Sequence, residues 1–87
     1  MAIFCQDYKI LFMDIDEILM KFGDFIRIER LRMRLSQEML AEKASLHKNC
    51  ISKVESGKHN PTLITILKLA KALEIEPYKL LMFSQDK

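Results

Sequence analysis

The sequence predicts an all-α protein built from five short helices. Only two glycines and two prolines occur among its 87 residues, too few for the frequent tight turns of a β-sandwich or barrel. Hydrophobic residues make up 49% of the chain and charged residues 30%, as in a folded globular domain and unlike a disordered tail. A chain of this length can bury one core, so a single compact helical domain is expected.

The first helix is expected at residues 22–33, where apolar residues recur at helical spacing after a start at Gly23 or Asp24. The residues before it form an apolar arm at 1–21, too hydrophobic to be left in water and expected to become helical from Asp14 onward. We therefore divide the chain into this arm, a domain at 22–83 and a tail at 84–87.

The second and third helices are delimited by capping residues. Ser36 is a suitable N-cap for a helix that runs to about Lys43. After a tight connector at 44–46, a third helix is expected at 48–56, with Gly57 just past its end. Two short helices joined in this way are typical of a helix-turn-helix.

The fourth and fifth helices complete the predicted bundle. Thr62 follows an Asn-Pro turn and is expected to cap the fourth helix, and Pro77 is expected to open the fifth, which carries Leu80 and Leu81. The fourth helix has five apolar residues at helical spacing, which predict its buried face: Leu63, Ile66, Leu67, Ala70 and Leu73.

Charge and residue usage exclude several functional classes. Cys5 and Cys50 are too few for a disulfide framework, and the two histidines show no metal-ligand spacing, so neither a metal nor another cofactor is expected. Charged residues interrupt the apolar N-terminal stretch, which excludes a signal peptide core or a membrane span. No arrangement of nucleophile, base and orienting group indicates an enzyme. The net charge is −2 in residues 1–23 and +3 in residues 24–60, which favours an anionic partner for the latter segment.

The spacing between Gln37 and Val54 fits a helix-turn-helix closely. If Gln37 is its first position, Ala41 is the fifth, where close helix crossing requires a small residue. Ile51 is then the fifteenth position and Val54 the eighteenth, where apolar side chains hold the second helix of the motif on the core.

These stretches resemble the Cro/repressor-type family, also called Xre-like. The resemblance is carried by Leu35-Ser36-Gln37-Glu38, Leu40-Ala41-Glu42-Lys43-Ala44, the segment from Ile51 to Lys58, and Asn60-Pro61-Thr62-Leu63, and it covers about residues 22–81. It implies a five-helix, lambda-repressor-like DNA-binding fold. Arg34, Ser45 and Glu74 stand at positions where the family often has glycine, and we expect Glu74 to adopt a left-handed backbone conformation.

The resemblance implies that the third helix enters the major groove of DNA. The candidate DNA-binding residues are Gln37, His47, Lys48, Asn49, Ser52, Lys53, Lys58 and Asn60. Lysine suits guanine O6 and N7 or phosphate, and asparagine can bond adenine bidentately. The family pattern also implies that Arg30 pairs with Glu55 to tie the first helix to the third.

Several of these residues also have a purely structural interpretation. Gln37 is either a phosphate contact or a first-turn polar residue, and Asn49 contacts a base or caps the helix. His47 is expected to cap the helix or contact phosphate. Lys48 and Lys53 contact DNA or are ordinary solvated lysines. Cys50 is expected to pack or to lie at the edge of the DNA-facing surface.

Such domains commonly bind DNA as two-fold dimers. The predicted interface consists of Ile64, Tyr78, Met82 and Phe83, with the N-terminal arm as a competing candidate. The function expected is regulation of transcription from a palindromic operator, in the cytoplasm of a bacterium or phage host and at the nucleoid. The expected role is that of a phage repressor, an antitoxin or a restriction-modification controller protein. RNA polymerase is a further expected partner, and no small-molecule ligand is expected. The alternative is a protein-interaction module that uses the same fold.

Overall fold

The computed structural model describes residues 14–82, which form five α-helices and no strand. They are α2 (Ile15–Arg32), α3 (Gln37–Ala44), α4 (Lys48–Glu55), α5 (Leu63–Leu73) and α6 (Pro77–Leu80). The all-helical class expected from the sequence is confirmed. Phe83 and the tail at 84–87 lie outside the described residues, as do positions 1–13 of the arm.

Helix α2 begins earlier than the helix predicted at 22–33. Asp14 is its N-cap, and the Asp14 carboxylate accepts a hydrogen bond from the Glu17 backbone N–H at 2.8 Å. The helix then runs without interruption across position 21, in line with the helix expected from Asp14 onward. The predicted start at Gly23 or Asp24 is wrong, because Gly23 is buried in the middle of α2.

Helices α3 and α4 confirm the predicted bounds to within one residue. The Ser36 hydroxyl accepts from the Met39 N–H at 3.0 Å and caps α3. The connector turns at Ser45, which has φ 57° and ψ 44°. Gly57 follows α4 at φ 78°, the left-handed conformation expected past a helix end.

Helix α5 is capped by Thr62 as predicted, but its buried face differs from the predicted one. Ile66, Ala70 and Leu73 do face the core, together with Leu69 and Ala72. Leu63 is 68% exposed and Leu67 40% exposed, so their assignment to the buried face is wrong. Apolar residues lie all around this helix, and periodicity alone could not show which arc meets the other helices.

Helix α6 is a single turn opened by Pro77, and it buries Leu80 completely. Leu81 lies just past the helix and is 52% exposed. Within residues 14–82, three residues other than glycine adopt positive φ: Arg34 (60°), Ser45 (57°) and Glu74 (60°). The left-handed conformation expected of Glu74 is confirmed, and Arg34 and Ser45 share it.

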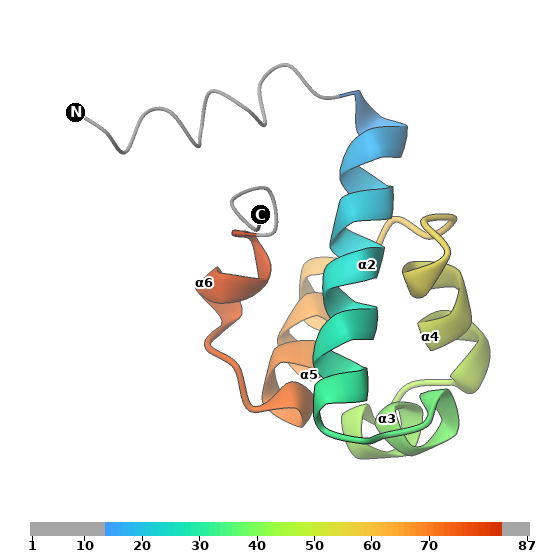
Figure 1. Ribbon diagram of the computed structural model, residues 1–87, viewed down its shortest axis with the longest axis vertical. Coiled ribbons are helices and arrows are strands. Elements are labelled where there is room, and N and C mark those ends of the chain that lie inside the picture. Colours follow the sequence, from blue (N-terminus) through green and yellow to red (C-terminus); the bar gives the residue numbers. More distant parts are fainter. Residues whose placement is uncertain (1–13, 83–87) are drawn as a thin grey trace.

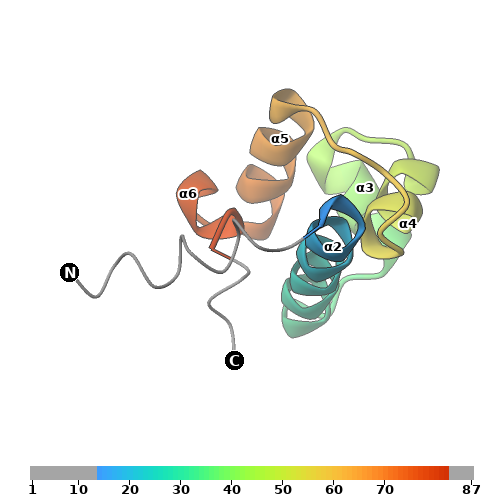
Figure 2. The same cartoon turned by 90° about the horizontal axis from the view of Figure 1, so that it is seen from above.

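The long helix α2 stands between two groups of helices. Figure 1 shows α4 beside it on one side and α5 and α6 on the other, with α3 across the lower end; Figure 2 shows the same arrangement from above. The core between them is built from residues of all five helices, and its largest fully enclosed side chains are Ile26, Leu40, Ile51, Val54, Leu69 and Leu80. Helix α4 therefore packs against both α2 and α3.

Both glycines lie where α2 approaches α4. A Cβ at Gly23 would lie 2.3 Å from the Val54 carbonyl oxygen and 2.9 Å from the Glu55 carbonyl oxygen. A Cβ at Gly57 would lie 2.8 Å from Cγ of Met20. Because Gly23 has no side chain, the C-terminal end of α4 can lie directly against the backbone of α2.

Candidate nucleic-acid interface

The two helices of the motif are held by the residues that the spacing predicted. Ala41 is 3% exposed on α3, and a small side chain there lets α3 and α4 pack directly against each other. On α4, Ile51 is completely buried and Val54 is 1% exposed. These contacts fix which face of α4 points to the core and which points outward.

The outward face of α4 carries four of the candidate DNA-binding residues. Lys48, Asn49, Ser52 and Lys53 are all exposed, whereas Ile51, Val54 and Glu55 are buried. Residues separated by one, four and five positions share one side of an α-helix. The structure therefore brings two ammonium groups, an amide and a hydroxyl onto one short polar surface.

His47 caps the helix that carries this surface. Its Nδ1 accepts a hydrogen bond from the Asn49 backbone N–H at 3.0 Å, and its backbone is extended. This arrangement confirms the capping interpretation of His47 and leaves Nε2 as the ring nitrogen that can meet another group. The cap of α4 is thus His47, and the alternative in which Asn49 caps the helix is not observed.

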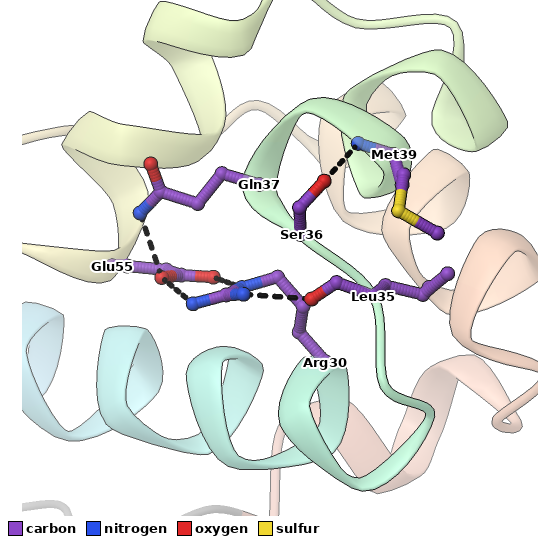
Figure 3. Close-up of polar contacts among 6 residues, drawn as sticks. All are labelled: Arg30, Leu35, Ser36, Gln37, Met39 and Glu55. Atoms are coloured by element: carbon purple, nitrogen blue, oxygen red, sulfur yellow. Dashed lines mark hydrogen bonds and ion pairs between the residues drawn. The ribbon is translucent and has the colours of Figure 1, made fainter.

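A buried ion pair joins α4 to α2. Glu55 receives two hydrogen bonds from Arg30, from Nε at 2.6 Å and from Nη2 at 3.1 Å, and the two side chains are only 4% and 10% exposed (Figure 3). Arg30 also donates from Nη1 to the Leu35 carbonyl at 2.8 Å, in the connection to α3. A carboxylate near a helix C-terminus is unfavourable by itself, and the bidentate arginine offsets this. The predicted Arg30–Glu55 pair is confirmed.

Gln37 belongs to the same network. Its side-chain amide donates to Oε1 of Glu55 at 3.0 Å, so the first residue of α3 is bonded to the last residue of α4 (Figure 3). The structural interpretation of Gln37 is thus observed. A glutamine amide has two N–H groups, and one of them is used here. Contact between Gln37 and a phosphate stays a prediction.

Lys48 has an ion-pair partner that sequence reasoning missed. Its Nζ lies 3.4 Å from Oε2 of Glu38, and both side chains are well exposed, at 53% and 71%. Glu38 lies in the first turn of α3, where a negative charge also suits the helix dipole. The sequence signal that could have indicated this pair is the helix-turn-helix motif, because the motif brings the first turns of its two helices together. The outward face of α4 therefore has an acidic neighbour on α3.

Lys58 and Asn60 lie beyond the C-terminal end of α4, where the Lys58 backbone N–H donates to the Lys53 carbonyl at 2.9 Å. Both are exposed in the connection at 58–62 that follows α4, whereas Lys48 opens the helix at its other end. Eight helical residues span about 12 Å. A partner that contacts both Lys48 and Lys58 must therefore extend along the whole of α4, as a DNA backbone does.

Other kinds of site find little support in residues 14–82. No three histidine, cysteine or acidic side chains in that range gather where they could hold a metal ion. None of the helices described is long and apolar enough to cross a membrane.

Comparison with known proteins identifies the family. A helix-turn-helix family model matches residues 26–80. The chain is 47% identical over 75 residues to the control protein C.SmaI of Serratia marcescens, with 86% of each chain covered. It is 40% identical over 70 residues to the control protein C.BamHI of Bacillus amyloliquefaciens, across 79% of this chain and 86% of that one.

Solved structures agree with this assignment. The crystal structure of the restriction-modification controller protein C.AhdI from Aeromonas hydrophila matches with a TM-score of 0.70 and 47% sequence identity, and the match covers 71% of this chain and 94% of that one. The match to the crystal structure of a hypothetical transcription factor, NHTF, from Neisseria has a TM-score of 0.71 at 32% identity, over 78% of this chain and 76% of that one. This chain therefore belongs to the Cro/repressor-type helix-turn-helix family of DNA-binding transcription regulators, which are not enzymes, in the group of the control proteins.

Proposed function

We propose that this protein binds a palindromic operator as a homodimer and controls transcription within a restriction-modification system. The control proteins and the controller protein to which it is similar point to that system. In each subunit α4 lies in the major groove, with Lys48, Asn49, Ser52 and Lys53 toward the bases and phosphates. The protein acts at the nucleoid in the cytoplasm, where it controls transcription by RNA polymerase.

The observation that carries this proposal is the division of α4 into two faces. One face is held on the core by Ile51 and Val54 and by the Glu55 network, so the helix is a rigid support. The other face is polar and exposed. A rigid helix with exposed lysine and asparagine side chains offers the donors that base edges and phosphates accept.

The dimer is proposed on a separate apolar surface of α5 and α6. Ile64 is 59% exposed, Tyr78 61% and Met82 39%, and none of them is needed by the core. Phe83, the fourth predicted interface residue, lies outside the described residues. Two such domains related by a two-fold axis would present their α4 helices to half-sites about 34 Å apart on one face of DNA.

The DNA-binding part is tested by selection from random duplexes. The wild-type protein should select an inverted repeat, and its affinity should fall steeply with salt, with about −0.9 in the log–log slope for each phosphate neutralised. Asn49→Ala should relax selection at one position of each half-site if Asn49 contacts a base. Lys48→Ala and Lys53→Ala should likewise relax selection at one position if the lysine contacts a base. If the lysine contacts a phosphate, the substitution should weaken binding to all duplexes alike.

Lys68→Ala is the matched control, since it removes the same charge from an exposed position on α5. It should change neither the selected sequence nor the affinity. If the wild-type protein selects no sequence, and the α4 variants behave like Lys68→Ala, the proposal is wrong and the fold serves as a protein-interaction module.

The dimer is tested by Ile64→Lys, which places a charge on the proposed interface. Sedimentation equilibrium should show a dimer for the wild-type protein and a monomer for this variant. Ile28→Lys is the control, because Ile28 is also exposed, at 44%, but lies on α2. A wild-type monomer, or dissociation by both substitutions alike, would contradict this interface.

A further inference from the structure

The two lysines on the outward face of α4 have different electrostatic surroundings. The Lys48 Nζ lies 3.4 Å from Oε2 of Glu38, and the two side chains are 53% and 71% exposed. Glu38 is the second residue of α3 and Lys48 is the first residue of α4, so this ion pair joins the starts of the two helices of the motif. Lys53 has no ion-pair partner within residues 14–82.

The ion pair leaves Lys48 able to bind a further acceptor. An ammonium group carries three N–H donors, and one carboxylate oxygen at 3.4 Å cannot engage all of them. More than half of the Lys48 side chain is exposed, so its remaining donors can meet a partner that lies against α4. Lys48 can therefore contact DNA while it stays beside Glu38.

The carboxylate of Glu38 changes which DNA acceptor suits Lys48. Guanine O6 and N7 are uncharged acceptors in the major groove, and lysine binds them well. A phosphate is an anion, and a phosphate in contact with the Lys48 ammonium would lie close to the Glu38 carboxylate, which repels it. The ion pair therefore opposes a phosphate contact of Lys48 more strongly than a base contact. No such carboxylate opposes a phosphate contact of Lys53.

We propose that Glu38 is a specificity-determining residue, which reserves Lys48 for a base contact and lowers the affinity of the protein for DNA of other sequence. This inference rests on the proposed function, because it concerns the same surface of α4. Phosphate contacts supply nearly all of the binding to non-operator DNA, and there Glu38 weakens the contribution of Lys48. On the operator, Lys48 donates to guanine and keeps its partner, and Lys53 contacts phosphate.

The exposure of the ion pair limits the size of the effect. An exposed pair changes an equilibrium constant by at most about fivefold. Glu38→Gln keeps the length of the side chain and removes its charge, so the affinity for a random duplex should rise about three- to fivefold. The affinity for the operator should rise by less than about twofold, because the base acceptors are uncharged. The ratio of operator affinity to random-duplex affinity should therefore fall.

Equilibrium titrations of the full-length protein with the selected operator and with a random duplex of equal length test this inference. Glu42→Gln is the matched control, because Glu42 is also exposed on α3, loses the same charge and lies one helical turn farther from the start of the helix. It should leave the ratio of the two affinities unchanged. An unchanged ratio for Glu38→Gln, the same fall for both variants, or weaker operator binding by Glu38→Gln would overturn the inference.

The salt dependence of operator binding distinguishes the two lysines. Lys53→Ala should reduce the steepness of the log–log salt slope by about 0.9, the loss expected for one phosphate contact, whereas Lys48→Ala should change the slope little and relax selection at one position. An equal change of slope for both variants would place Lys48 on phosphate and overturn the inference. If the wild-type protein selects no operator, both the proposed function and the inference are wrong. Selection of an operator with an unchanged affinity ratio in Glu38→Gln contradicts the inference alone.

Discussion

Replacing Gly23 with alanine should destabilise the protein, although helix propensity alone predicts the opposite. Gly23 lies inside α2, where alanine is favoured over glycine by about 1 kcal/mol. In this position, however, the new methyl group would lie 2.3 Å from the Val54 carbonyl oxygen and 2.9 Å from that of Glu55. The two effects have opposite signs, so the experiment distinguishes between them.

The steric effect is expected to dominate. Ordinary contacts between carbon and carbonyl oxygen are about 3.3–3.6 Å, so α2 and α4 must separate by roughly 1 Å. Both nearest atoms belong to the backbone and cannot move aside by a side-chain rotation. Overpacking costs about 1–3 kcal/mol, and a backbone displacement lies at the upper end. After the gain in propensity, a net loss of about 2 kcal/mol is expected, or roughly 8–16 °C in Tm for a domain of this size.

Urea and thermal unfolding followed by far-ultraviolet circular dichroism would measure this loss. Asp24→Ala is the control on the neighbouring exposed position of α2, and it should leave stability unchanged or raise it slightly. An increase in the Tm of Gly23→Ala would refute the close approach of α2 and α4. Unchanged stability with weaker operator binding would instead show that α4 had moved at little cost.

Three further predictions concern the turn, the buried network and the exposed ion pair. Ser45→Gly should raise the unfolding free energy by about 0.5–1 kcal/mol because a non-glycine residue is strained at φ 57°, whereas Ser45→Ala should bring no gain in the same urea titration. Glu55→Ala should lower the unfolding free energy by about 3–5 kcal/mol, because Arg30 would keep a buried charge with no partner. A loss below about 1 kcal/mol would argue against the buried Arg30–Glu55 pair. Glu38→Gln should change stability by less than about 0.5 kcal/mol, since its pair with Lys48 is exposed, yet tighten operator binding by removing a negative charge near the phosphates. Equilibrium titrations with duplex DNA would check this, and weaker binding would show instead that Glu38 positions Lys48.

Much of the local structure was predictable from the sequence. Ser36 and Thr62 cap α3 and α5 as expected, and Gly57 follows α4 in the left-handed conformation. Ala41 and Ile51 are buried at the positions where the motif requires it. These signals are local, because a cap or a turn involves residues only a few positions apart, and the motif spacing follows from the crossing of two consecutive helices.

Apart from the Arg30–Glu55 pair, which the family pattern implied, side-chain partners could not be predicted in the same way. Gln37 and Lys48 are polar residues at exposed helix starts, a pattern that also suits contact with DNA. Only the crossing of α3 and α4 shows that Gln37 bonds Glu55 and that Lys48 lies beside Glu38. Side chains from different helices meet only after the helices have packed, and their positions along the chain carry little information about this.

The sequence alone determined the number of helices from 22 onward, the capping residues of α3 and α5, and the polar outward face of α4. Tertiary structure decided which apolar residues of α5 are enclosed, leaving Leu63 and Leu67 exposed, and why the centre of α2 requires glycine. The physical reason is the range of the interactions. Caps and amphipathic spacing act within one or two turns of the chain, whereas burial and close backbone approach depend on which helix surface lies opposite.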